Sequence, residues 1–277
     1  MTLKPWHAPL GIAVVSLVLT LISVPSSTWF TSASLSLASG VAATAMMGAA
    51  SLLAARWNWV ESAFGGLDRV YLAHKWLGVW ALGLASYHLV FKAGINVWDT
   101  APIMEWPRYY MRLVRQLSFV GLMFIVLLAL NRRIRYRLWR LWHKLSGPIF
   151  IVVILHWLTF ASPIKLSDPA GVWLAAVSGL GLAGAFYKLL LYRMLARHAE
   201  YRVTGVTPGS KAVHLQLEPV RAAIPFKPGQ FGFLQLKEDG LREPHPFTIA
   251  SGAAARWPSG LRDPGSGRFH HPTGERL

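Results

Sequence analysis

Apolar segments of helical length alternate with short polar loops from the N-terminus to about residue 199. A run of about 20 apolar residues is long enough to cross a bilayer as a helix. Six apolar segments approach this length, and they cover residues 9–24, 34–55, 70–91, 113–130, 142–160 and 171–192. We therefore expect a six-helix transmembrane bundle over residues 1–199.

The pattern changes at residue 200. The stretches EYRVTGV, AVHLQLEPV and GQFGFLQL alternate apolar and polar residues, which is typical of strands with one buried face. KPGQ and EDG are turn sequences between them. Residues 200–252 therefore predict the start of an antiparallel β domain, and the fold class is a mainly α membrane protein followed by a short β domain.

Composition supports a membrane location. The chain of 277 residues is 53% hydrophobic and 14% charged, and its mean hydropathy is +0.38. It has no cysteine, which excludes disulfides, thiolate-ligated heme and cysteine-ligated iron–sulfur clusters. The net charge of +16 lies mostly at segment ends and in the tail. We interpret this charge as contact with membrane lipid, and we expect no nucleic-acid partner.

Lysine and arginine are distributed unevenly between the loops. Residues 56–75 and 131–144 are rich in them, whereas the loops at the opposite ends of the segments are poorer. Because positively charged short loops stay in the cytoplasm, both termini are predicted to be cytoplasmic. The expected location is a bacterial inner (plasma) membrane, crossed several times.

Four histidines lie at or inside apolar segments: His74 and His88 on one, and His143 and His156 on another. Ionisable groups inside a membrane are costly and point to function. Fourteen residues of ideal helix return to within about 40° of the same face and climb about 21 Å, so His74 and His88 face one way at two depths. A matching pair on a second helix predicts two stacked b-type hemes, each between two axial histidines. The predicted pairs are His74 with His143 at the inner level and His88 with His156 at the outer level.

The spacing of the second pair fits less well, because 13 residues turn an ideal helix by about 220°. Gly147 and Pro148 lie between these histidines, and proline bends or breaks a helix. We therefore expect an irregular turn there. Gly78, Gly83 and Gly147 are expected to leave room for a porphyrin between helix backbones.

Other interpretations exist for each residue. A single membrane histidine can form an interhelical hydrogen bond or act in a proton relay. A non-heme metal site is disfavoured, because the two histidines of each helix are too far apart to share an ion. Arg56, at the inner end of the second segment, is a candidate partner for a heme propionate or a simple charged flank of the helix.

Two later motifs carry a family resemblance. Paired histidines, then PGQF at residues 228–231 and HPFTIAS at residues 245–251, resemble the ferric reductase and NADPH oxidase family over about residues 35–252. The resemblance implies that residues 200–252 are the N-terminal part of an antiparallel FAD-binding β-barrel. The implied FAD contacts are His245, Pro246, Phe247, Thr248 and Ser251.

The resemblance also implies a function. An oxidoreductase of this family would pass electrons from a cytoplasmic flavin through the two hemes to an external acceptor, ferric iron or oxygen. No glycine-rich nucleotide-binding pattern follows Ser251, so NAD(P)H would act only through a missing or separate domain, and FAD binding in this truncated barrel is expected to be weak. One alternative is a heme membrane subunit that delivers electrons to a separate periplasmic reductase. Another is a non-redox transporter or scaffold with buried histidines.

Residues 253–277 lack a core-forming pattern and are rich in Arg, Pro and Gly. We expect a tail that is disordered or frameshifted and that packs against nothing. With suitable codons, a one-base shift over residues 261–272 gives a strand followed by Gly-Asp-Phe-Thr, which resembles the segment after HPFT in this family.

Overall fold

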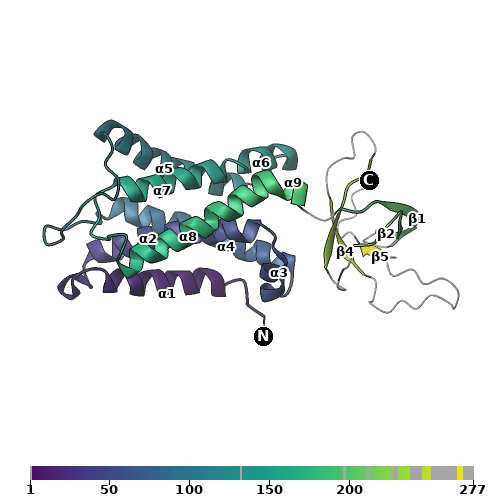
Figure 1. The fold of residues 1–277 in the computed structure, drawn as a ribbon, viewed down its shortest axis with the longest axis horizontal. Coiled ribbons are helices and arrows are strands. Elements are labelled where there is room, and N and C mark those ends of the chain that lie inside the picture. Colours follow the sequence, from purple (N-terminus) through teal and green to yellow (C-terminus); the bar gives the residue numbers. More distant parts are fainter. Residues whose placement is uncertain are drawn as a thin grey trace. The chain divides into compact units, whose positions relative to one another are not determined.

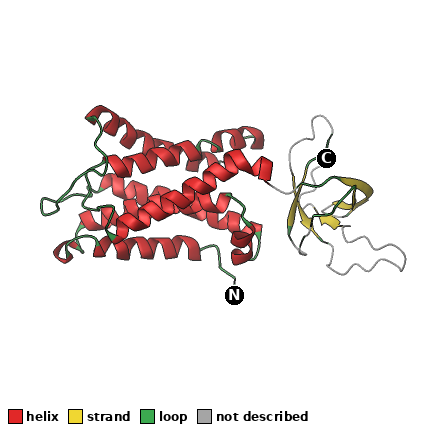
Figure 2. Cartoon of the chain, viewed as in Figure 1, coloured by secondary structure: helices red, strands yellow, loops and turns green. Residues whose placement is uncertain are grey.

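The computed structural model describes residues 2–131, 133–195, 198–209, 213–224, 226, 230–237 and 245–250, and a strand at 267–270. At residues 193, 245, 246 and 267–270 only the backbone is described. The chain divides into two compact units, Met1–Arg193 and Met194–Leu277. The first is helical and the second contains the strands (Figures 1 and 2).

Each of the six predicted apolar segments is mainly helical, and the fifth, 142–160, is divided between α6 and α7. The helices are α1 (His7–Ile22), α2 (Ser32–Ala54), α3 (Asn58–Phe64), α4 (Leu67–Val90), α5 (Arg108–Leu130), α6 (Tyr136–His143), α7 (Ser146–Thr159), α8 (Pro169–Phe186) and α9 (Tyr192–Leu195), with a 3-10 turn η1 (Ser26–Thr28) and a π-helix η2 (Tyr187–Leu191). The short helices α3 and α6 were not predicted.

Four described stretches are long and apolar enough to cross a membrane: Ser32–Ala54, Arg108–Leu130, Tyr136–Thr159 and Pro169–Leu191. Helix α1 is apolar but shorter, and α4 is less apolar because polar and aromatic side chains, including two histidines, lie along it. Length and composition therefore support four spans, and the six-span topology remains a prediction.

Helix α2 is the central element of the helical unit. It packs against α1, α4 and α8, and most of its side chains are small and buried. A Cβ on Gly181 of α8 would lie 2.7 Å from Cα of Gly48 on α2, so the two backbones are in direct contact there. Small residues allow such close helix packing in membranes. The Ala- and Ser-rich sequence of α2 thus makes it the scaffold on which the histidine-bearing α4 lies.

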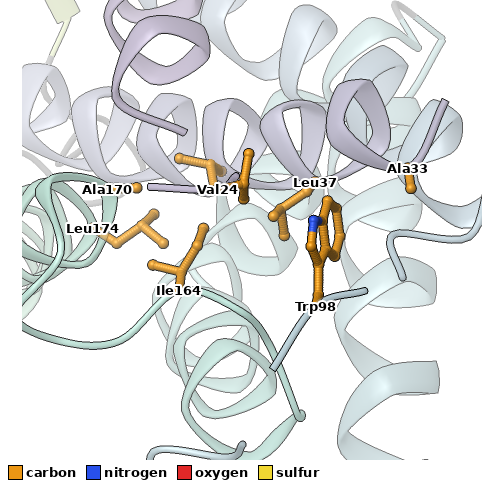
Figure 3. Packing of buried hydrophobic residues seen from close by; sticks show 8 residues of the cluster. Val24, Ala33, Leu37, Trp98, Ile164, Ala170 and Leu174 are labelled. Carbon is orange, nitrogen blue, oxygen red and sulfur yellow. The ribbon is translucent and has the colours of Figure 1, made fainter. Parts of the chain in front are cut away.

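A hydrophobic cluster closes the end of the bundle where α2 begins. Figure 3 shows the Trp98 indole beside Leu37 of α2, in a cluster that includes Val24, Ile164 and Leu174. Nε1 of Trp98 donates a hydrogen bond to Oγ1 of Thr28 at 3.1 Å. This packing fixes loop residues from three connections against the first turns of α2.

The irregular turn expected between His143 and His156 is present. Helix α6 ends at His143, Lys144 and Leu145 form a turn, and α7 begins at Ser146. The break therefore lies just before Gly147 and Pro148, and Pro148 falls in the first turn of α7, where its missing N–H costs nothing. Because the two histidines belong to different helices, the 220° rotation of one ideal helix does not apply.

The second unit contains a five-stranded antiparallel sheet with the order β1-β2-β5-β4-β3. Its strands are β1 (Tyr201–Pro208), β2 (Val213–Pro219), β3 (Phe231–Leu234), β4 (His245–Ile249) and β5 (Gly267–His270). The first three confirm the predicted strands. The described strands do not close into a barrel, since β1 and β3 have no partner on their outer sides among them.

HPFTI forms strand β4, which pairs with β3 and β5. One prediction for the second unit needs correction. The expectation that residues 253–277 pack against nothing is wrong for Gly267–His270, because this segment forms β5 between β2 and β4. Its pairing needs only backbone hydrogen bonds, which any non-proline residue can supply.

Candidate functional site

The two histidines of α4 are held by the backbone of α2. Nδ1 of His74 lies 2.8 Å from the carbonyl oxygen of Ala50, and Nδ1 of His88 lies 2.9 Å from that of Ser36. A carbonyl oxygen only accepts, so each Nδ1 must carry the proton and donate. Each Nε2 then keeps its lone pair, which is the arrangement found for metal-bound histidines whose other ring nitrogen donates to a carbonyl.

The opposing histidines come from α6 and α7. The ring of His143 lies 6.0 Å from that of His74, and the ring of His156 lies 6.4 Å from that of His88, centroid to centroid. The structure therefore brings the four histidines together in the two pairs that the sequence predicts.

These separations suit two imidazoles on opposite sides of one metal atom. Metal–imidazole bonds of about 2.0–2.1 Å put the two ligating nitrogens about 4 Å apart and the two ring centroids about 6 Å apart. The near-equal spacing of both pairs fits a common axial geometry.

The donor set favours a porphyrin over a bare ion. Among the described residues, no three His, Cys, Asp or Glu side chains converge on one point. A tetrahedral metal site needs more protein ligands than one histidine pair, whereas a heme iron takes four ligands from its ring. In addition, Nδ1 of His143 and Nδ1 of His156 are buried with no hydrogen-bond partner among the described residues.

Arg56 lies at the same end of α2 as the carbonyl that holds His74. It follows the last residues of α2, and its φ of 60° is the only positive φ of a non-glycine residue in the described part. Its guanidinium lies 5.5 Å from the Tyr71 ring centroid and 5.9 Å from that of Tyr192. Strained backbone persists where its surroundings over-determine it, often at functional sites. Arg56 is thus held in place between two rings, which is more than a loose charged flank requires.

Lys188 joins this cluster, and the sequence reasoning missed it. Its Nζ lies 3.5 Å from the Tyr192 ring centroid, so Lys188 and Arg56 share one aromatic ring. Lys188 belongs to the π-helix η2, and π-helical turns frequently mark functional sites. The available signal was a lysine inside the apolar run of the sixth segment.

The glycines expected to make room for a porphyrin differ in their surroundings. A Cβ on Gly83 would meet no atom within 4 Å, and one on Gly78 would meet only Val126 at 3.9 Å. A Cβ on Gly147 would lie 3.0 Å from Leu189, so that space is filled by a side chain. A glycine that was not predicted, Gly40 on α2, faces His88: a Cβ there would lie 2.8 Å from Nδ1 of His88.

The expected flavin residues lie in the second unit. Phe247 is 2% exposed and belongs to the core of the sheet with Leu215, Leu217 and Ile249. Thr248 is half-buried and, by the alternation of a strand, points to the opposite face. The side chains of His245 and Pro246, and the whole of Ser251, lie outside the described residues.

Comparison with known proteins agrees with this geometry. The helical unit is a membrane bundle that presents two facing pairs of histidines. Residues 39–154 match the family described as "Ferric reductase like transmembrane component". The match covers α4, α6 and most of α7, with His156 just beyond its end.

A curated relative supports the same assignment. The "Probable cell surface ferric reductase kap2" of Aspergillus oryzae is 26% identical over 235 residues, which cover 81% of this chain. The chain spans 30% of the length of that relative. The two matches both point to the ferric reductase family, and the four long apolar helices make the protein integral to a membrane. Because this relative is fungal, the expected bacterial membrane has no support from the comparison.

Proposed function

We propose that this protein is an oxidoreductase that carries electrons across a membrane, from a cytoplasmic flavin through two b-type hemes to an external acceptor such as ferric iron or oxygen. The observation that carries the proposal is the pair of facing histidines at each of two levels, 6.0 and 6.4 Å apart. The similarity to ferric reductases also supports it.

In this proposal His74, His88, His143 and His156 would hold the two hemes, one facing pair for each heme. A bound heme supplies one-electron chemistry, because its iron alternates between the ferric and ferrous states. The protein holds the α4 imidazoles in one tautomer through the carbonyls of α2, which also raises the basicity of each ligating Nε2. His74 and His88 lie about 21 Å apart along α4, so the two sites span most of the roughly 30 Å hydrocarbon layer.

The cationic cluster has a role at the inner level. Arg56 and Lys188 lie at the end of the bundle that holds His74, and Tyr71 stands one helical turn before His74 on α4. A heme carries two carboxylates, and cations in a partly buried site bind carboxylates more strongly than cations in water do. We assign Arg56 and Lys188 as the groups that bind these propionates.

The positive charge of the loops favours six spans with cytoplasmic termini. On this topology the cluster of Arg56 and Lys188 lies on the cytoplasmic side. The sheet of the second unit contains the HPFTI strand, β4. We propose that this strand binds the flavin and that the side chain of Thr248 contacts the flavin. NAD(P)H is proposed to act through a separate domain.

A visible spectrum of the purified protein tests the proposal. The expected result is a Soret band and α bands that sharpen on reduction, with two hemes per chain by pyridine hemochrome assay. His88→Ala is expected to halve the heme content and leave the inner site occupied. His7→Ala, which changes a histidine outside the pairs, serves as the control and should keep both hemes. If wild-type protein is incubated with excess heme and shows no heme absorption once unbound heme is removed, the proposal is rejected.

A further inference from the structure

A column of stacked aromatic rings ends at His143. Its ring stacks on Trp139 with centroids 5.1 Å apart and planes at 15°, and Trp139 stacks on Tyr136 at 5.5 Å and 25°. The three residues follow one another at intervals of three and four along α6, so they form one stripe of that helix. Three flat side chains therefore lie face to face, from the start of α6 to a member of the inner histidine pair.

Stacking in this column orients the His143 ring, for which the described residues provide no hydrogen bond at Nδ1. His74, on the other side of the pair, is oriented by the carbonyl of Ala50. Nδ1 of His143 has no hydrogen-bond partner among the described residues, so no such bond fixes the rotation of its ring. Nearly parallel rings at about 5 Å are in the offset-stacked geometry that aromatic pairs prefer. The face of Trp139 is thus the contact that sets the plane of the His143 imidazole.

The same column covers one side of His143. Helix α6 contains no fully buried residue, and Tyr136 at its start is 59% exposed. Trp139 and His143 are half-buried. Exposure therefore falls along the column, with the Trp139 indole lying between the exposed Tyr136 and the histidine. The apolar shell around a metal site controls solvent access and, through it, the reduction potential.

We propose that Trp139 is the positioning residue for His143 and shields its coordination position at the inner heme. This inference rests on the proposed heme ligation. Without the indole face, the His143 ring can rotate away from its ligating orientation. The inner site then gains an open position for a small ligand and admits water, which favours the more highly charged ferric form.

The outer pair offers an internal comparison. His156 contacts Phe160 at 4.8 Å, but the planes are tilted by 53°, so that ring gives a poorer flat contact. The effect of removing the indole is therefore specific to the inner level. An effect on both hemes would indicate general loosening of the bundle.

Binding of carbon monoxide to the dithionite-reduced, full-length protein in detergent tests the proposal. Wild type, with two axial histidines per heme, should bind almost none. Trp139→Met, which keeps an apolar side chain and loses the flat face, should bind it at about half of the total heme. Redox titration of the same variant should show one midpoint potential moved to a lower value and the other unchanged. Trp139→Phe, which keeps a flat ring, should behave like the wild type in both measurements.

Trp142→Leu is the matched control, because Trp142 lies on the same helix but packs edge-on against Phe124 at 6.1 Å. It should leave carbon monoxide binding and both potentials unchanged. Loss of the inner heme alone in Trp139→Met, with retention in Trp139→Phe, would also support the proposal. Two six-coordinate hemes with unchanged potentials in Trp139→Met would overturn it. Absence of heme from wild type would instead overturn the proposed function itself.

Discussion

Nδ1 of His88 lies 2.9 Å from the carbonyl oxygen of Ser36, so a side chain of α4 is oriented by the backbone of α2. The contact is possible because α2 carries Gly40 one turn further on, and any Cβ there would lie 2.8 Å from the same Nδ1. A glycine and a carbonyl on one helix thus define the position of a predicted heme ligand on another.

This relationship predicts the effect of Gly40→Ala. The added methyl group must displace the His88 ring, because an α2 backbone packed against α4 cannot retreat. Loss of a hydrogen bond that orients a ligand typically lowers metal affinity by about 10–100-fold. We therefore expect selective loss of the outer heme, measured as heme retained after gel filtration. Gly11→Ala, where a Cβ meets nothing within 4 Å, should retain both hemes.

A second prediction concerns the contact between α2 and α8. A Cβ on Gly181 would lie 2.7 Å from Cα of Gly48 and 2.8 Å from the ring of Phe150. Overpacking of this kind costs about 1–3 kcal/mol. Gly181→Ala should lower the melting temperature of the detergent-solubilised protein. Gly179→Ala on the same helix, which meets no atom within 4 Å, should not lower it. Equal melting temperatures for the two variants would show that the helices are less closely packed.

The cationic cluster gives a third prediction. Lys188→Gln removes one of the two cations assigned to the propionates and keeps most of the side-chain length. The inner heme should then be lost faster to an excess of a heme-scavenging apoprotein, while the outer heme is lost at the wild-type rate. Lys75→Gln removes the same charge from an exposed position on α4 and provides the control. If the two variants lose heme at the same rate, Lys188 has no role in retaining it.

The sequence predicted the parts of the structure that depend on apolar length and on the spacing of polar residues. The six helical segments and both histidine pairs follow from these features alone. The position of the helix break did not, because proline is acceptable in the first turn of a helix, and Pro148 lies in the first turn of α7. Lys188 was missed because its partners, Arg56 and Tyr192, come together only through packing and a π-helical turn.

The second unit was harder to predict for a different reason. Alternation identifies strands that bury one face, and it should have shown that Phe247 and Ile249 face the core. It cannot identify a strand such as β5, whose place in the sheet rests on the backbone hydrogen bonds of four residues. A frameshift in the last residues stays a prediction that resequencing of the gene would test.

The last prediction separates packing from flavin binding in β4. Phe247 is 2% exposed within the core of the sheet, so Phe247→Ala should destabilise the second unit by about 3–5 kcal/mol. Thr248→Val is isosteric and removes one hydroxyl, whose neutral hydrogen bond is worth about 0.5–1.5 kcal/mol. It should weaken FAD binding by up to about tenfold, measured by flavin fluorescence titration of the full chain. Hydrogen exchange of β2 and β4 should rise in Phe247→Ala and stay at the wild-type level in Thr248→Val. A Phe247→Ala protein with normal exchange protection and no flavin affinity would show that Phe247 contacts the flavin, as the family resemblance implies.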